Sequence, residues 1–191
     1  MIVGILLAAG KGTRFGSQKL LARLPGGDTV VEASARVLQG ALTRVVAVTA
    51  AENAVAKALR ACGCEVVINP RAEEGMGTSI AAGVAAMVAT TMEDTEGWLI
   101  ALGDMPYVLP ATMAKLHTTL ASEGGIVVPT YQTKRGHPVG FHGRFRAALV
   151  GLEGDAGAKK IVAAYHREVN FLAVNDSGVI ADIDTPADMR G

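Results

Sequence analysis

The sequence predicts a three-layer α/β domain built around a mostly parallel central sheet. Short runs of β-branched and other apolar residues alternate with longer stretches of helical spacing. The short runs are apolar at successive positions, as expected for strands that are covered on both faces. No internal repeat or shift in composition divides the chain, so we expect residues 1–191 to form a single domain.

The elements follow one another in a regular order. Buried runs predict strands at 2–8, 44–49, 65–69, 98–102, 126–129, 138–141, 169–174 and 179–182. Helical spacing predicts helices at 29–39, 52–61, 77–89, 110–121, 145–150 and 156–165. Asp28 is placed to cap the first helix, and Pro110 to begin the fourth. Ligands of such sheets bind beyond the carboxyl ends of the strands, so binding residues are expected in the loops that follow them.

The charge balance excludes several classes of partner. Eighteen Lys and Arg residues match eighteen Asp and Glu residues, so no basic excess indicates a nucleic acid or an anionic membrane. The apolar run at the start precedes its basic residues, which is not the order of a signal peptide, and it is too short to span a bilayer. We therefore expect a cytoplasmic protein. Cys62 and Cys64, on either side of Gly63 near a strand start, are interpreted as small hydrophobic residues.

The loop after the first strand is rich in glycine and basic residues. Gly10 and Gly12 allow the backbone amides to approach an anion, and Arg14 and Lys19 add positive charge where phosphates would lie. The loop is no Walker motif, and it lacks the third glycine of the dinucleotide fingerprint. An ordinary glycine-rich turn with solvated cations fits the same spacing.

Acidic residues follow two other predicted strands. Asp104 lies in the loop after the strand at 98–102, Asp182 ends the run at 179–182, and Asp184 follows two residues later. Mg²⁺ takes oxygen ligands, commonly one or two carboxylates together with substrate phosphates. Only one of Asp182 and Asp184 is expected to bind the metal directly. Turn or helix-cap roles are the alternative for each carboxylate.

A glycine turn also opens the helix predicted at 77–89. Gly77 and Ser79 lie in its first turn, where free backbone N–H groups suit a phosphate or a base carbonyl. A plain helix start, capped by Thr78 or Ser79, fits the same residues.

Taken in order along the chain, these segments resemble a known family. The motifs are LLAAGKGTRFGSQKLL, GMGTSIAAG, LGDMP, TYQTKRGHPVGF, GDAGA and DIDTPADM. Together they are similar to the nucleotidyltransferases of molybdenum-cofactor biosynthesis, in particular the cytidylyltransferases that join CTP to molybdopterin. The opening motif is shared with many sugar-phosphate and isoprenoid-precursor nucleotidyltransferases, whereas RGHPVGF and GDAGA are narrower. Ala8-Ala9-Gly10, in place of Ala-Gly-Gly, favours cytidine over guanosine.

The resemblance implies a Rossmann-like nucleotidyltransferase fold, Mg²⁺ as the cofactor, and CTP and molybdopterin as substrates. It assigns the nucleotide to Leu7, Ala8, Ala9, Gly10, Gly12, Arg14, Lys19, Gly77 and Ser79. It assigns the acceptor to Arg135, His137, Pro138, Gly154, Asp155 and Gly157. It assigns the metal to Asp104 with Asp182 and Asp184, and catalysis to Arg14, Lys19 and Asp104.

Other functions remain open on the sequence. GTP or another phosphorylated acceptor, such as a sugar phosphate, would use the same phosphate-handling motifs. A chaperone that holds molybdopterin and passes it to a molybdoenzyme is a second alternative. A dinucleotide-binding oxidoreductase is disfavoured by the missing third glycine and by Thr49-Ala50-Ala51, where an acidic residue would close the second strand.

Overall fold

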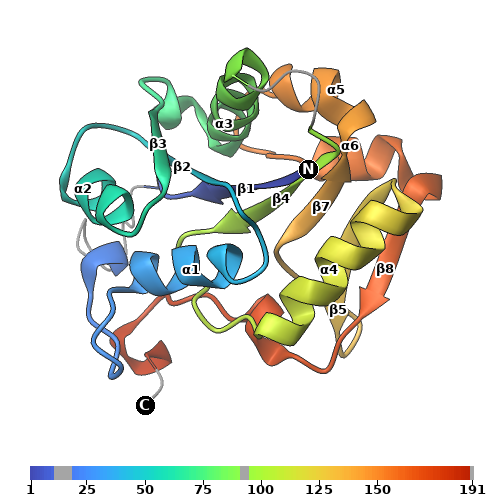
Figure 1. The fold of residues 1–191 in the computed structure, drawn as a ribbon. Coiled ribbons are helices and arrows are strands. Elements are labelled where there is room, and N and C mark those ends of the chain that lie inside the picture. Colours follow the sequence, from blue (N-terminus) through green and yellow to red (C-terminus); the bar gives the residue numbers. More distant parts are fainter. Residues whose placement is uncertain (11–18, 91–94, 190–191) are drawn as a thin grey trace.

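The computed structural model describes residues 1–10, 19–90 and 95–189. The strands of this part form one eight-stranded sheet (Figure 1). They are β1 (Ile2–Leu7), β2 (Val45–Thr49), β3 (Glu65–Ile68), β4 (Gly97–Leu102), β5 (Ile126–Tyr131), β6 (Lys134–Arg135), β7 (Val139–His142) and β8 (Val169–Ala173). The mixed α/β class and the central sheet agree with the prediction.

The sheet is mostly parallel, which is also as predicted. Strands β3, β2, β1 and β4 lie side by side and run in the same direction. Strand β7 is antiparallel to both β4 and β5, so β5 and its parallel neighbour β8 point the same way as β4. The carboxyl ends of β1, β2, β3 and β4 therefore meet at one edge of the sheet.

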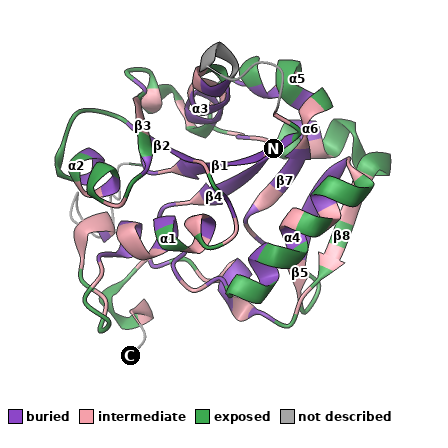
Figure 2. Ribbon diagram, viewed as in Figure 1, coloured by how far each residue is buried: buried purple, intermediate pink, exposed green. Residues whose placement is uncertain are grey.

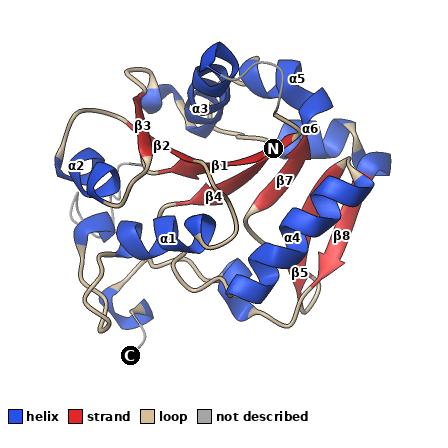
Figure 3. Cartoon of the chain, viewed as in Figure 1, coloured by secondary structure: helices blue, strands red, loops and turns tan. Residues whose placement is uncertain are grey.

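Helices cover both faces of the sheet and complete the three layers (Figure 3). They are α1 (Val30–Gln39), α2 (Ala54–Ala61), α3 (Met76–Thr90), α4 (Pro110–Glu123), α5 (Arg146–Val150) and α6 (Lys159–Ala164). Side chains of α1, α2 and α4 share one hydrophobic cluster, whereas those of α3, α5 and α6 share another. No helix in the described ranges is long and apolar enough to cross a membrane.

Strand β1 lies at the centre and contributes to both clusters. Ile2 and Leu6 belong to the cluster beneath α1 and α4, whereas Val3 and Ile5 belong to the cluster beneath α3. This alternation follows from the two-residue period of a strand, and all four side chains are at most 3% exposed. The purple centre of Figure 2 is this buried sheet. A continuous apolar run is therefore required at β1, as its sequence indicated.

Two local predictions were wrong. Residues 179–182 form no strand, because Ser177–Ile180 is a 3₁₀ helix whose start is capped by the side chain of Asp176. The cap of α1 is Thr29 and not Asp28; the Asp28 carboxylate instead pairs with Arg36. The pattern of apolar residues does not show which of two neighbouring polar side chains caps a helix. It also does not show that a capped helical turn forms in place of a strand.

The neighbourhood of the cysteines also differs from the prediction. Cys62 is not on a strand but ends α2, and Cys64 lies just before β3. Both are free thiols. Burial raises the pKa of Cys64 to about 11, which keeps this thiol protonated and unreactive near neutral pH.

Candidate active site

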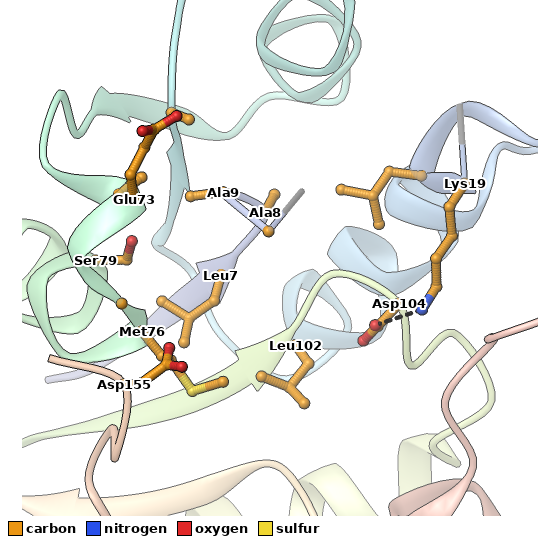
Figure 4. Close-up of a pocket in the computed structure, with 15 residues that line it drawn as sticks. Leu7, Ala8, Ala9, Lys19, Glu73, Met76, Ser79, Leu102, Asp104 and Asp155 are labelled. Atoms are coloured by element: carbon orange, nitrogen blue, oxygen red, sulfur yellow. Dashed lines mark hydrogen bonds and ion pairs between the residues drawn. The ribbon is translucent and has the colours of Figure 1, made fainter. Parts of the chain in front are cut away.

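A cavity of about 610 Å³ opens at the carboxyl ends of the central strands. Strands β1, β2 and β4 end against it, and the first turn of α3 forms another wall (Figure 4). Its lining consists of Leu7, Ala8, Ala9, Gly10, Lys19, Leu20, Ala50, Ala72, Glu73, Gly75, Met76, Ser79, Leu102, Asp104 and Asp155. The cavity lies where the fold class predicts a ligand, and its volume suits a molecule of nucleotide size.

Close backbone packing builds the wall beside α3. The N–H of Gly77 donates to the carbonyl of Gly154 over 2.8 Å. Gly75 has a φ of +124°, and a Cβ on it would lie 2.4 Å from the carbonyl carbon of Gly154. Only glycine fits there, both by conformation and by space. The contact joins Gly77 and Ser79, predicted for the nucleotide, to Gly154 and Asp155, predicted for the acceptor.

At the opposite end of the cavity, one lysine contacts two carboxylates. The Nζ of Lys19 donates to Asp104 Oδ2 over 3.0 Å and to Asp184 Oδ1 over 2.9 Å. The side chain of Lys19 is only 10% exposed. Burial by itself lowers the pKa of Lys19, but the hydrogen bonds and attraction of Asp184 and Asp104 outweigh that effect and raise it. Lys19 is therefore a fixed positive charge in this site.

Three chain segments distant in sequence meet at this ion pair. Lys19 begins a 3₁₀ turn, Asp104 follows β4, and Asp184 lies beyond the 3₁₀ helix Ser177–Ile180. A backbone hydrogen bond from Ile183 N–H to the carbonyl of Asp104, at 2.9 Å, ties the two acidic segments together. The expected proximity of Asp104 to the acidic pair near the C-terminus is present, although Asp184 does not follow a strand.

The two carboxylates could supply some of the ligands of a divalent cation. Asp104 Oδ1 is buried and has no hydrogen-bond partner among the described residues, which leaves a full acceptor for a cation. No group of three His, Cys, Asp or Glu residues in the described ranges could hold a metal by itself. Mg²⁺ commonly binds one or two carboxylates and fills its other positions with water and phosphate oxygens. Asp104 and Asp184 meet that requirement when a phosphate is present.

The structure separates Asp182 from Asp184. Asp182 is exposed and lines a smaller hollow of about 270 Å³, together with Arg135 and His137. The Arg135 guanidinium stacks 4.8 Å from the ring centroid of Phe171. The hollow shares Leu102 with the main cavity, so the two lie side by side.

His137 enters this hollow as a neutral ring. Burial lowers its pKa, and a hydrogen bond to the backbone of Ile100 together with the charge of Asp104 offsets this only in part. Its Nδ1 is buried and has no partner among the described residues. The next residue, Pro138, follows a cis peptide bond.

The remaining predicted residues are distributed as follows. Gly12 and Arg14 lie outside the described residues. Gly157 has a φ of +54° and packs beside Met76, so it shapes the wall next to Asp155. No site role was predicted for the cavity residues Leu20, Ala50, Ala72, Glu73, Gly75, Met76 and Leu102. Glu73 stands in a charged surface stretch, where nothing in the residue pattern separates a lining carboxylate from a solvated one.

Comparison with known proteins agrees with this geometry. The family model described as the MobA-like NTP transferase domain matches residues 4–169. Nicotine blue oxidoreductase from Paenarthrobacter nicotinovorans is 32% identical, and the alignment covers 98% of this chain and 94% of that protein. Purine catabolism protein PucB from Bacillus subtilis (strain 168) is 29% identical over 97% of this chain and 92% of that protein.

A solved structure extends the likeness to three dimensions. Rv0371c from Mycobacterium tuberculosis H37Rv is 30% identical, covers 98% of this chain and 94% of its own, and superposes with a TM-score of 0.78. A second structure of Rv0371c is a complex with manganese, with a TM-score of 0.72. A relative at this level of identity thus binds a divalent cation.

Proposed function

The chain belongs to the MobA-like NTP transferase family, and we propose that within this family it transfers CMP from CTP onto molybdopterin in the cytoplasm, as one domain and with release of pyrophosphate. The observation that carries the proposal is the arrangement of Lys19, Asp104 and Asp184 at one end of a cavity of nucleotide size. Family membership supports the class of reaction. The step Ala8-Ala9-Gly10 supports the choice of CTP, and the RGHPVGF and GDAGA segments support the choice of acceptor.

The proposed reaction joins two phosphates. The phosphate of the acceptor attacks the α-phosphorus of CTP in line, a new P–O–P bond forms, and the bond to the β-phosphate breaks. A phosphate monoester is already an anion near pH 7, so the attack needs no general base. Catalysis then depends on positioning and on neutralising charge as pyrophosphate leaves. Lys19 and Arg14 are proposed for that neutralisation.

The metal is proposed to be Mg²⁺, held by Asp104 and Asp184. When bound, it supplies positive charge to the triphosphate oxygens and helps to orient them. The orphaned Oδ1 of Asp104 supports this assignment, as does the manganese complex of Rv0371c. The base and ribose are proposed to lie along Leu7, Ala8 and Ala9, with Ser79 on the wall that α3 forms. Gly77, whose N–H donates to Gly154, is proposed to shape that wall.

The acceptor is proposed to enter beside the shared residue Leu102. Arg135 supplies a cation there, and His137, which lines the same hollow, is proposed to contact the acceptor phosphate. Asp155 lies at the far end of the main cavity, next to Gly154 and Gly157, and is proposed to contact polar groups of the acceptor. Contact with a molybdoenzyme or its chaperone would then be needed to hand over the product.

A second candidate function is that of an oxidoreductase with a dinucleotide cofactor. The observation that favours it is the 32% identity to a protein named nicotine blue oxidoreductase. The nucleotide half of such a cofactor would occupy the same cavity. The Lys19 site favours the transferase, because hydride transfer makes no use of two carboxylates around a cation.

One assay separates these functions. Pyrophosphate release is measured with each of the four NTPs and Mg²⁺, with and without molybdopterin, and oxidation of reduced nicotinamide dinucleotides is followed in parallel. Release with CTP that depends on molybdopterin is the expected result. Release with GTP, or only with sugar phosphates, would replace the substrates but keep the reaction class. Dinucleotide oxidation without pyrophosphate release from any NTP would contradict the proposed function.

A further inference from the structure

We propose that Lys19 closes the metal site to free divalent cations and releases it when a triphosphate binds. The inference rests on the proposed function, since it assumes that the cavity takes an NTP. It adds an order of binding events to that function, because the cation is inferred to enter together with the nucleotide and not before it. Lys19 thus acts as a positioning residue in addition to its proposed contact with phosphate.

The first step of the argument is the position of the ammonium. Lys19 Nζ lies 3.0 Å from Asp104 Oδ2 and 2.9 Å from Asp184 Oδ1, so it occupies the space between the two carboxylates. A metal ion that bridged these carboxylates would have to lie in the same space between them. An ammonium and a divalent cation repel each other strongly at such short range in a partly buried site. The two cations therefore compete for one place.

The second step is the charge of the site. Asp104, Asp184 and Lys19 together carry a net charge of −1, compared with −2 for the carboxylates by themselves. The Lys19 side chain is 10% exposed and that of Asp104 is 26% exposed, so water screens this difference only in part. Free Mg²⁺ also loses its bound water only at a high cost in free energy. Two carboxylates that already interact with a lysine attract the ion too weakly to offset that cost.

The third step is what a triphosphate changes. Lys19 lines the main cavity, so its ammonium can turn to phosphate oxygens without leaving the site. Phosphate oxygens are strong acceptors for a lysine and are at the same time good ligands for Mg²⁺. Binding of the nucleotide thus draws the Lys19 ammonium away from the carboxylates and at the same time supplies phosphate oxygens as further ligands for the metal. Asp104 Oδ1, buried and without a partner among the described residues, is the acceptor left ready for the incoming cation.

The test measures metal binding without nucleotide. Mn²⁺ is titrated into the chain of residues 1–191 and the free ion is followed by electron paramagnetic resonance, for the wild type, Lys19→Gln, Lys19→Met and Lys19→Arg. Lys57→Gln is the matched control, because Lys57 is exposed on α2 and its substitution removes the same charge elsewhere. We expect Lys19→Gln and Lys19→Met to bind Mn²⁺ roughly tenfold more tightly or better, since the ammonium that repels the cation is then absent. Lys19→Arg and Lys57→Gln should match the wild type.

Each outcome is decisive. Equal Mn²⁺ affinity of the wild type and both neutral variants, with unchanged thermal melts, would overturn the inference, and so would tight binding by Lys19→Arg. Using two neutral variants keeps the test valid when one of them folds poorly. Because no turnover is involved, a gain in Mn²⁺ affinity supports the inference even where no NTP releases pyrophosphate. Pyrophosphate release without that gain supports the proposed function and removes the inference.

Discussion

At the scale of single residues, the candidate site depends on which carboxylate lies beside Asp104. Asp184 does so, because both carboxylates accept hydrogen bonds from the ammonium of Lys19. Asp182 is exposed and lines the neighbouring hollow with Arg135. Two acidic residues only two positions apart thus face different ligands. Because their surroundings differ, replacing each aspartate by asparagine should affect catalysis differently.

Asp184→Asn should lower kcat far more than Asp182→Asn. The amide keeps the shape of the side chain but removes the negative charge that, we propose, helps to hold the metal, and loss of such an electrostatic contact costs about 100-fold or more. Asp182→Asn should act mainly on the KM for the acceptor. Steady-state kinetics of pyrophosphate release measures both. A larger loss of kcat in Asp182→Asn would reverse the assignment of the metal ligand.

Gly75 is a second residue whose identity the structure requires. Its φ is +124°, and a Cβ would lie 2.4 Å from the backbone of Gly154. Gly75→Ala should destabilise the protein by about 1–3 kcal/mol, because strain and a backbone clash occur together. Gly27→Ala is the control, since Gly27 has a φ of +96° with nothing within 4 Å of its added Cβ. Urea unfolding of both variants measures the difference, and equal losses would show that the contact with Gly154 carries no extra cost.

At the scale of elements, the start of α1 shows a complete capping box. The Thr29 hydroxyl accepts from Glu32 N–H, and the Glu32 carboxylate accepts from both the N–H and the hydroxyl of Thr29. Thr29→Ala should therefore cost about 1 kcal/mol of stability. Asp28→Ala should cost less, because its pair with Arg36 lies at the surface. Thermal or urea unfolding decides between them, and a larger loss for Asp28→Ala would restore Asp28 as the cap.

The same capping box predicts a dependence on pH. Hydrogen bonds from the backbone and the hydroxyl of Thr29 lower the pKa of Glu32 below its ordinary value of 4.5. The folded state thus binds this proton less readily than the unfolded state, so the stabilisation is fully present above pH 4.5 and is lost as the pH falls below it. Glu32→Gln should be less stable than the wild type at pH 7, and the gap should narrow under acid. A gap of constant size from pH 7 to pH 3 would contradict this role of the charge.

The elements also show how far the sequence carries a prediction. Central strands such as β1 and β4 were predicted within a residue or two, because burial on both faces requires an apolar run at those positions. The run at 179–182 misled for the same reason, since Val179 is buried without belonging to a strand. The short strand β6 (Lys134–Arg135) has no apolar pattern at all and exists only because Thr130 and Tyr131 pair with it. Local periodicity cannot report such a tertiary partner.

For the site, the sequence located the loops but not the contacts. Glycine-rich and acidic segments after strands pointed to Gly10, Asp104 and Ser79, all of which line the main cavity. The bridge from Lys19 to two carboxylates joins residues 85 and 165 positions apart, and no spacing rule reaches that far. The contact between Gly75 and Gly154 was missed for the same reason.

At the scale of the whole molecule, the segment 176–184 must be held against the loop between β4 and α4, because that joint brings Asp184 to Asp104. Asp176 accepts one of the hydrogen bonds that hold these segments together. Its side chain is buried and accepts from the N–H of Leu109 and the N–H of Gly178, each over 2.8 Å. Gly178 packs so closely that an added Cβ would lie 2.1 Å from the carbonyl oxygen of Tyr107. The C-terminal part of the site is thus anchored to the start of α4.

Asp176→Ala should therefore weaken both the fold and the site. Two buried N–H groups lose their acceptor, which costs about 1–3 kcal/mol for each group left unsatisfied. With the joint loosened, Asp184 would no longer be fixed beside Asp104, so kcat for pyrophosphate release should fall under conditions in which the variant is still folded. Urea unfolding gives the first quantity and steady-state kinetics the second, with Asp28→Ala as a surface control. Full activity in a clearly destabilised Asp176→Ala would mean that Lys19 and the backbone hydrogen bond between Ile183 and Asp104 are enough to hold Asp184 in place.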